Sequence, residues 1–190
     1  MQNKGRPRIP IPTQVEVLFR DRWLCHLCGR PTVFHLTFKY LAEIVRAKYP
    51  TLGTAYWHLR SRRDAAPLLD ELGACIDHVT PVSRRGTDDP SNLAVACGRC
   101  NVRKSARVKD EYLRLNPRWV VRGKHGEPTD WDGLSALFVA LVAAKTARLS
   151  RTDREWLVAL QHHFENPKTR QLANTGLQPT PAGAILSRRG

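Results

Sequence analysis

Two Cys-x-x-Cys pairs constrain this chain of 190 residues more than any other feature. The first pair is Cys25 and Cys28, and the second is Cys97 and Cys100. Two residues between cysteines allow both sulfurs to turn onto one metal ion, and four thiolates fill the tetrahedral shell of Zn²⁺. The pairs therefore predict a structural zinc site that joins two segments far apart in the sequence.

The distance between the pairs is a second constraint. Because 68 residues separate Cys28 from Cys97, a shared zinc requires the intervening segment to fold as its own lobe. The alternative is two unrelated pairs, one of them redox active. The N-terminal residues lack the apolar run of a secretory signal, which favours metal ligation over disulfides and leads us to expect a cytoplasmic protein. The fifth cysteine, Cys75, is expected to be a small buried hydrophobe.

Apolar periodicity predicts helices on both sides of a short pair of strands, which is an α+β pattern. Thr13 with Glu16 predicts a capping box for the first helix, and Thr152 with Glu155 predicts another for the last. The helices are expected over 13–23, 37–48, 54–63, 65–72, 101–115, 131–149 and 155–164. The last two are expected to pack as a helical hairpin.

The strands are expected over 74–79 and 93–96, with a polar loop over 83–92 between them. The order from residue 74 is therefore strand, loop, strand, helix. His26 lies between the first two cysteines and is expected to be a solvated bystander rather than a further ligand.

The charge of the chain favours a polyanionic partner. Hydrophobic residues make up 42 %, enough for a core, and the net charge is +14. No apolar run is long enough to span a bilayer, since the longest, 134–144, has about half the necessary length. The basic residues crowd around the second cysteine pair, so nucleic acid, DNA or RNA, is the expected partner. The residues expected to contact phosphate are Arg84, Arg85, Arg103, Lys104 and Arg107. A merely solvated basic face is the alternative.

Three residues near the strands suit phosphodiester hydrolysis. His78 is a natural general base because imidazole titrates near neutral pH. Asp77 and Asn101 offer hard oxygen ligands for one Mg²⁺ or Mn²⁺. Asn101 is expected at the start of a helix, whose free N–H groups would face phosphate. Neighbouring residues in a regular strand face opposite sides, so Asp77 and His78 can share a site only if the strand twists there. The alternative for His78 is a surface histidine before a proline turn.

The residues of this stretch together resemble the HNH endonuclease family. The family pattern is a D-H pair, a downstream proline, N-L before the second strand, and C-x-x-C-[HN] followed by Lys. The matching residues are Asp77, His78, Pro81, Asn92, Leu93, Cys97, Cys100, Asn101 and Lys104. The flanking cysteine pairs match the zinc-bearing subgroup. Asn101 replaces the last His, as in the HNH domains of RNA-guided CRISPR effectors.

The resemblance implies a ββα-metal fold with one divalent ion between a hairpin and a helix. It implies His78 as general base, Asp77 and Asn101 as ligands of the catalytic metal, and Asn92 as a brace of the hairpin loop. Two features depart from the pattern: the insertion over 31–73, and Gly86-Thr87 where many members have Gly-Gly. The expected organisation is a flexible basic arm over 1–12, a nuclease domain with zinc over 13–116, a helical extension over 117–165 and a disordered tail over 166–190.

The leading hypothesis is a Mg²⁺-dependent DNA endonuclease from a defence system or a mobile element. A second hypothesis is a catalytically silent, zinc-stabilised module that binds nucleic acid. A third is an effector gated by a partner, with the apolar face over 131–149 docking a protein or a second copy in a homodimer. Metal-dependent cutting discriminates the first hypothesis from the second.

Overall fold

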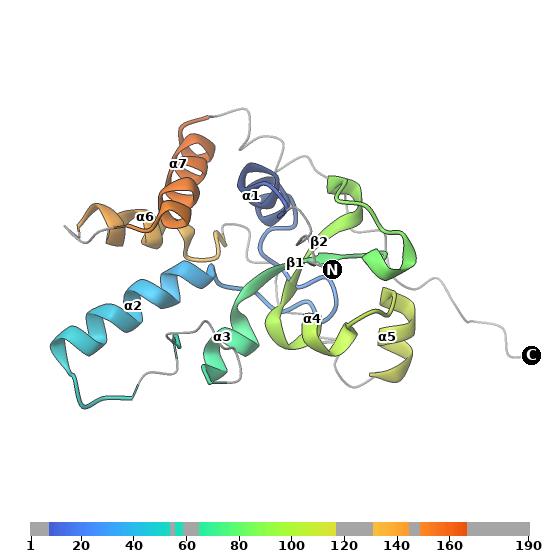
Figure 1. The fold of residues 1–190 in the computed structure, drawn as a ribbon, viewed down its shortest axis with the longest axis horizontal. Coiled ribbons are helices and arrows are strands. Elements are labelled where there is room, and N and C mark those ends of the chain that lie inside the picture. Colours follow the sequence, from blue (N-terminus) through green and yellow to red (C-terminus); the bar gives the residue numbers. More distant parts are fainter. Residues whose placement is uncertain (1–7, 54–55, 59–64, 117–130, 145–148, 167–190) are drawn as a thin grey trace, which may run out of the picture.

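The computed structural model describes residues 8–53, 56–58, 65–116, 131–144 and 149–166 (Figure 1). Four predictions fall wholly or mostly outside these residues: the basic arm, the helix near 54–63, the connection after 117 and the tail after 166. Among the described residues, no helix is long and apolar enough to cross a membrane.

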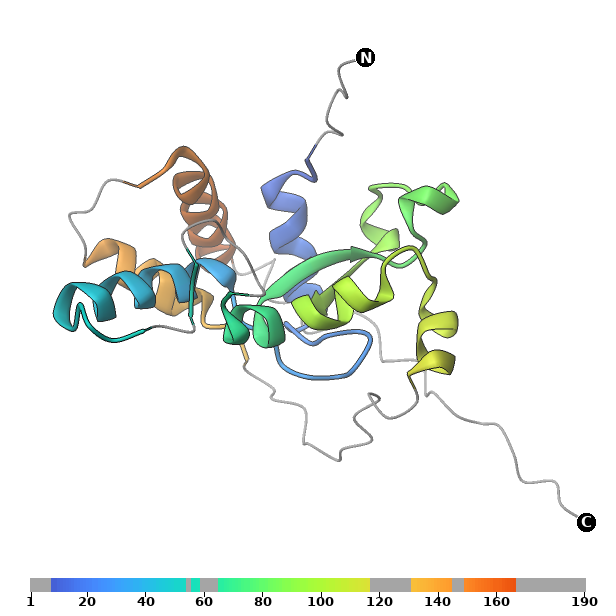
Figure 2. The same ribbon diagram turned by 60° about the horizontal axis from the view of Figure 1, so that its bottom comes forward.

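A two-stranded antiparallel sheet lies at the centre of the fold. Strand β1 (Ala74–His78) pairs with β2 (Leu93–Cys97), so that Asp77 lies opposite Ala94 and His78 opposite Leu93. Every residue of β2 is buried. Helix α4 (Gly98–Lys104) follows β2 directly and packs against both strands, as Figures 1 and 2 show. The predicted ββα arrangement and the α+β class are therefore confirmed.

Within the described residues, six further helices surround this unit. They are α1 (Ile11–Arg20), α2 (His35–Lys48), α3 (Pro67–Leu72), α5 (Lys109–Leu115), α6 (Ser135–Ala143) and α7 (Arg151–Glu165). Two short 3₁₀ turns, η1 (Val82–Arg84) and η2 (Pro90–Asn92), lie in the loop between the strands. Figure 1 places α1 between the hairpin on one side and α6 with α7 on the other. The last of these helices, α7, therefore returns to pack on the first helix, and α6 packs on α7.

The main core consists of aromatic side chains from distant segments. The ring of Phe34 lies 5.9 Å from that of Trp23, 5.1 Å from that of Phe138 and 5.0 Å from that of Trp156. All four side chains are at most 2 % exposed. Burying a side chain of this size stabilises the fold by about 1.5–3 kcal/mol relative to leaving it exposed. This core joins α1, α6, α7 and the sheet into one packed unit.

Neither predicted capping box forms. Helix α1 begins at Ile11, with Pro12 in its first turn and no side-chain cap. Proline suits that turn because its fixed φ is helical and the N–H it lacks has no partner there. Helix α7 is capped two residues earlier than predicted, at Ser150 instead of Thr152. Ser150 Oγ accepts the Asp153 N–H at 3.1 Å, and Asp153 Oδ2 accepts the Ser150 N–H at 3.3 Å.

The helix predicted over 101–115 is two helices. Helix α4 starts three residues earlier, at Gly98, and Ser105 ends it with a φ of 50°. Helix α5 then begins at Lys109. The break turns α5 back, so that the Tyr112 hydroxyl lies 3.5 Å from Cys100 Sγ. The prediction of one continuous helix over this range is therefore wrong.

Candidate active site and metal centre

The four paired cysteines form one buried cluster. The sulfurs of Cys25, Cys28, Cys97 and Cys100 all lie within 4.8 Å of one another, and each residue is at most 4 % exposed. The sulfurs of Cys28 and Cys97 are 4.0 Å apart. A tetrahedral Zn–S₄ centre with bonds of about 2.3 Å places its sulfurs about 3.8 Å apart. The spacing and the soft donor set therefore fit Zn²⁺.

Local backbone contacts shape both cysteine knuckles. In the first, Gly29 adopts a φ of +72° and donates its N–H to the Cys25 carbonyl at 2.7 Å. The His26 N–H donates to the Val95 carbonyl in β2 at 2.8 Å, which ties this knuckle to the sheet. The second knuckle is the junction of β2 and α4. The two knuckles therefore meet because the first is bound to β2, and β2 leads directly into the second.

The crowded thiols alter each other's acidity. Hydrogen bonds from the other thiols, with that of Cys25 the largest cause, hold the pKa of the Cys100 thiol well below its usual range. Hydrogen bonds with the other thiols, with that of Cys100 the largest cause, raise the pKa of the Cys25 thiol. Burial and the neighbouring Cys100 raise the pKa of Tyr112, which therefore stays a protonated hydrogen-bond donor to sulfur. A cluster that already stabilises a thiolate suits a metal cation.

A pocket of about 360 Å³ opens beside the hairpin and α4. Its lining comes from the end of β1, the following loop and the C-terminal half of α4. The lining residues include Asp77, His78, Asn101 and Lys104. Asp77 and His78 thus reach one pocket although they are adjacent in a strand. His78 is the last residue of β1, where regular pairing ends.

Asp77 is held from two sides. Its Oδ2 lies 2.8 Å from Nε2 of His26, and its Oδ1 accepts a hydrogen bond from Nζ of Lys104 at 3.0 Å. Asp77 is 6 % exposed and Lys104 only 1 %. Lys104 also donates to the His78 carbonyl at 2.8 Å. The prediction that His26 is a solvated bystander is wrong, because its ring contacts Asp77. Lys104 is an interior partner of the same carboxylate rather than part of the basic surface.

His78 pairs with a carboxylate from the loop. Its Nε2 lies 2.7 Å from Asp88 Oδ1. The side chain of His78 is 18 % exposed and that of Asp88 is 38 % exposed, so the pair borders solvent. A carboxylate that accepts from Nε2 fixes the proton of a neutral imidazole on that nitrogen. The lone pair of the ring is then on Nδ1.

Asn92 closes the loop that carries Asp88. Its Oδ1 accepts the Thr80 N–H at 2.8 Å, and its Nδ2 donates to the carbonyls of Thr80 and Thr87 at 3.1 and 2.8 Å. Gly86 lies inside this closure, since an added Cβ would stand 1.7 Å from the Thr80 oxygen. The loop therefore needs both the amide of Asn92 and a residue without a Cβ at position 86.

Asn101 lines the pocket from the middle of α4 rather than from its first residue. The predicted helix N-terminus at Asn101 is wrong, because the second knuckle itself forms the first turn of α4. In that turn the Cys100 N–H donates to Cys97, and the Gly98 N–H donates to the Gly73 carbonyl at 3.1 Å. The Cys100 N–H and the helix dipole therefore favour thiolate at the knuckle rather than phosphate at the pocket.

The comparison with protein-family models identifies this segment. The model described as HNH endonuclease matches residues 69–107, which include β1, the loop, β2 and α4. These residues form an HNH endonuclease domain. No curated protein and no solved structure matched the chain. The first knuckle, with Cys25 and Cys28, lies outside the matched residues but completes the cysteine cluster of the HNH domain.

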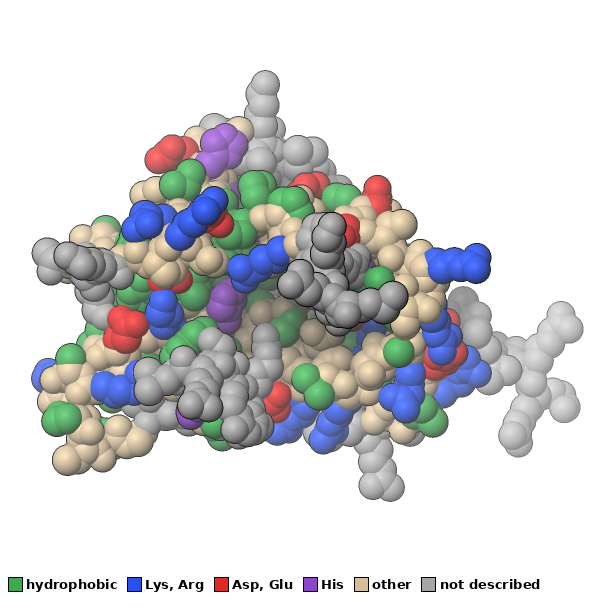
Figure 3. Space-filling view, viewed as in Figure 1, with side chains coloured by type: hydrophobic (Ala, Val, Ile, Leu, Met, Phe, Trp, Pro, Cys, Tyr) green, Lys and Arg blue, Asp and Glu red, His purple; other side chains and the backbone are tan. Residues whose placement is uncertain are grey.

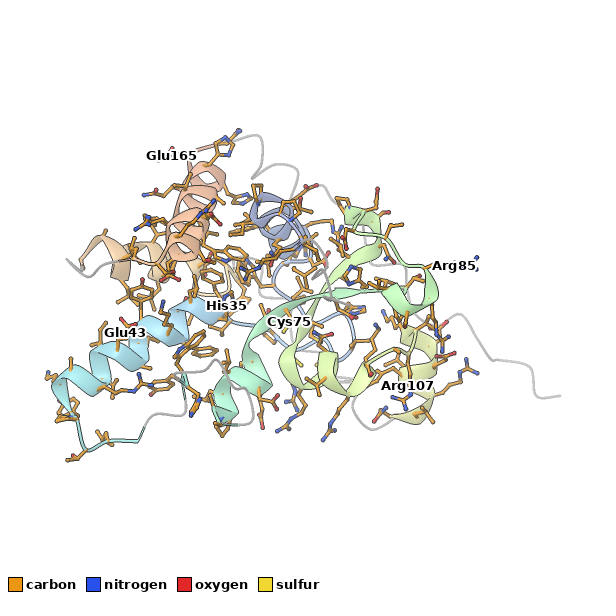
Figure 4. The ribbon with its side chains drawn as sticks, viewed as in Figure 1. His35, Glu43, Cys75, Arg85, Arg107 and Glu165 are labelled. Carbon is orange, nitrogen blue, oxygen red and sulfur yellow. The ribbon has the colours of Figure 1, made fainter. Side chains whose placement is uncertain are left out.

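Basic side chains surround the HNH domain, and Figure 3 shows Lys and Arg gathered over the region of α4, α5 and the loop. Arg85, Arg103 and Arg107 are exposed. Figure 4 shows Arg85 and Arg107 pointing outward from the loop and from the turn between α4 and α5. Arg84 is partly engaged, since its Nη1 donates to Glu111 at 2.8 Å. The exposed arginines thus offer a cationic surface beside the HNH pocket.

Sequence reasoning missed two side chains in contact with the predicted site residues of the HNH domain. His26 is 51 positions from Asp77 in the sequence, and no local pattern joins them. Asp88 could have been found, because a short loop between antiparallel strands returns its residues to the strand ends. Cys75 was expected to be buried; it is half-buried on β1, where Figure 4 labels it.

Proposed function

We propose that this protein is a divalent-metal-dependent endonuclease that hydrolyses phosphodiester bonds in DNA. In this proposal His78 is the general base, and Asp77 and Asn101 hold one Mg²⁺ or Mn²⁺. The observation that supports it best is the shared pocket, which brings these three side chains together inside an HNH endonuclease domain. A role in defence or in a mobile element stays a prediction from the family resemblance.

The pair of His78 and Asp88 supports the assignment of the base. Because Asp88 accepts from Nε2 at 2.7 Å, the ring is oriented with Nδ1 as its basic nitrogen. His78 would take a proton from water at Nδ1 as the water attacks phosphorus. Asp88 would then stabilise the imidazolium that forms, as a carboxylate does in other base–orienter pairs.

The oxygen donors of the pocket fit a hard cation. Asp77 receives one hydrogen bond on each oxygen from His26 and Lys104, and each carboxylate oxygen has a further lone pair for a metal. Asn101 adds an amide oxygen. When bound, a divalent ion would stabilise negative charge on the phosphate and on the leaving oxygen. Lys104 would balance part of the charge of Asp77 and hold the strand end through the His78 carbonyl.

We further propose that the cysteine cluster holds a structural Zn²⁺. Four buried sulfurs leave no position for water or substrate on such an ion. Its contribution would be to hold the first knuckle against β2 and the start of α4.

Incubation with supercoiled plasmid in Mg²⁺, Mn²⁺ or EDTA tests the proposed activity, with His78→Ala assayed beside the wild-type protein. We expect nicked or linear product only with metal and only with His78 intact. Cleavage in EDTA, or undiminished cleavage by His78→Ala, would contradict the assignment. A single-stranded RNA substrate assayed in parallel tests the preference for DNA.

One observation favours the second hypothesis, a catalytically silent module that binds nucleic acid. Both oxygens of Asp77 already have cationic or N–H partners in His26 and Lys104, which reduces the charge available to a metal. Binding of DNA without cutting, by folded protein with its full zinc content, would support that function instead.

A further inference from the structure

We propose that His26 is a positioning residue, through which the cysteine knuckle orients the carboxylate of Asp77 for the divalent metal. This inference rests on the proposed function, because it concerns the same metal. His26 lies outside residues 69–107, which the HNH model matches.

The first step is that Asp77 has a fixed orientation. His26 and Lys104 each hold one of its oxygens, at 2.8 and 3.0 Å. The carboxylate is 6 % exposed, so water competes little for these contacts. Two donors on different oxygens prevent the group from rotating about its Cβ–Cγ bond. The lone pairs that remain therefore point in set directions.

The second step is that His26 is itself held firmly. It is flanked by the knuckle ligands Cys25 and Cys28, and its backbone N–H bonds to the Val95 carbonyl at 2.8 Å. Val95 in turn donates its N–H to Asp21 Oδ2 at 2.9 Å. Because Asp77 pairs with Ala94, next to Val95 in β2, a ring anchored at Val95 reaches Asp77. The knuckle thus fixes the donor, and the sheet fixes the acceptor.

The third step separates the two partners of Asp77. Lys104 supplies charge, and its removal would leave a buried carboxylate without a counter-ion. His26 supplies a directed N–H from Nε2, because a carboxylate only accepts hydrogen bonds. Outer groups that orient a metal-binding carboxylate typically change metal affinity by about 10- to 100-fold when removed. His26 is the partner whose removal changes orientation while leaving the counter-ion of Asp77 in place.

The experiment measures Mn²⁺ binding by isothermal titration in the His78→Ala background, which avoids any dependence on cutting. His26→Ala should weaken Mn²⁺ binding about tenfold. His26→Gln should restore most of the Mn²⁺ affinity. The amide Nε2 of glutamine can donate a hydrogen bond to Asp77 from nearly the position of the imidazole Nε2. Arg99→Gln is the matched control from the second knuckle, since Arg99 contacts Asp70 and Glu71 rather than the pocket. It should bind Mn²⁺ like the parent.

Zinc content and melting temperature are measured on every variant. Unchanged Mn²⁺ affinity in a His26→Ala protein with full zinc content would overturn the inference while leaving the proposed function intact. Failure of the parent to bind Mn²⁺, or of the wild-type protein to cut, would overturn the proposed function and this inference with it. If His26→Ala loses zinc, the inference is tested by NMR on wild-type protein labelled with ¹⁵N-histidine, which shows which ring nitrogen of His26 carries the proton. A proton on Nε2 of His26 supports the inference, and a proton on Nδ1 alone overturns it.

Discussion

The Nε2 atom of His78 lies 2.7 Å from Oδ1 of Asp88, and ten positions of loop separate the two residues in the sequence. His78 ends β1, and Asp88 comes just before η2. The proposed base and the carboxylate that contacts it are therefore brought together by the closure of one loop, and substitution of either residue tests the role of both.

His78→Ala should lower the cleavage rate by about 10²–10⁴, the usual contribution of a general base. Asp88→Ala should lower the cleavage rate about tenfold, because the His78 ring keeps its basic nitrogen but loses the contact that orients it. Asp88→Asn should retain more activity than Asp88→Ala, since the amide oxygen can still accept from Nε2. The measurement is the single-turnover rate against pH. Asp89→Asn removes the same charge from the next residue and serves as control; an equal loss there would argue for a general charge effect.

The loop closure itself predicts linked losses of stability and rate. Asn92→Ala removes three hydrogen bonds to Thr80 and Thr87, and we expect the free energy of unfolding to fall by about 1–3 kcal/mol. Gly86→Ala should be at least as harmful, because its Cβ meets backbone atoms that cannot rotate away. Both variants should lose more activity than stability alone explains, since Asp88 is displaced. Denaturant titrations measure the loss of stability, and cleavage rates measure the loss of activity. A Gly86→Ala protein that cleaves DNA at the wild-type rate would contradict this prediction.

Removing zinc should unfold the region around the cluster. Cys97→Ser takes one ligand from a site that joins segments 69 positions apart, so we expect loss of bound zinc and of the cooperative thermal transition. Cys75→Ser is the matched control, because its sulfur lies outside the cluster. Zinc content by atomic absorption and melting curves check both variants. A Cys97→Ser protein that melted like the wild type would remove the structural role of the metal.

DNA binding should depend steeply on salt. Arg103 lies in α4 and Arg107 in the turn that follows it, and both are exposed. Each phosphate contact that is lost should reduce the slope of log K against log [salt] by about one. We therefore expect Arg103→Gln and Arg107→Gln each to flatten the slope without changing sequence preference. Arg154→Gln, on the distant helix α7, should leave the slope unchanged. Binding is followed by fluorescence anisotropy; a slope unaffected by all three substitutions would place the contact surface elsewhere.

The buried Asp153 predicts a loss of stability in acid. Desolvation raises the pKa of its carboxyl, but hydrogen bonds from Lys39 and Ser150 outweigh that effect and lower the pKa overall. A depressed pKa in the folded state contributes stability above the ordinary value near 4, and this contribution is lost as pH falls through the folded value. Asp153→Asn should therefore destabilise the protein by about 2 kcal/mol at pH 7 and by progressively less below about pH 4. Denaturant titrations at pH 7 and below about pH 4 measure the difference. Equal destabilisation by Asp153→Asn under both conditions would contradict a role for the charged carboxylate.

Local features of the active site could be predicted from sequence, because they are encoded within short segments. The strands around Asp77 and Leu93 follow from apolar runs bounded by turn residues. The convergence of the four cysteines follows from knuckle spacing and thiolate chemistry. Helix α2 lies close to its predicted range for a similar reason, since its apolar residues repeat at helical spacing.

The contacts that adjust the site depend on tertiary packing and could not be predicted. His26 reaches Asp77 only because its backbone is tied to Val95 across the fold. The break at Ser105 allows Tyr112 to contact Cys100, and no helical pattern in the sequence indicates that contact. Helix α1 begins without a side-chain cap, with Pro12 in its first turn, and α7 is capped by Ser150 although Thr152 offers the same hydroxyl two residues later.

The order of the two knuckles along the chain also bears on protein synthesis. Cys25, Cys28 and His26 leave the ribosome long before Cys97, Cys100 and the HNH residues between them. A nascent chain that ends anywhere in α2 or α3 has two of the four sulfurs and none of the pocket. The second cysteine pair and Asn101 follow Asp77 and His78 within 24 positions of chain, so one short stretch of synthesis completes both the cysteine cluster and the proposed catalytic residues.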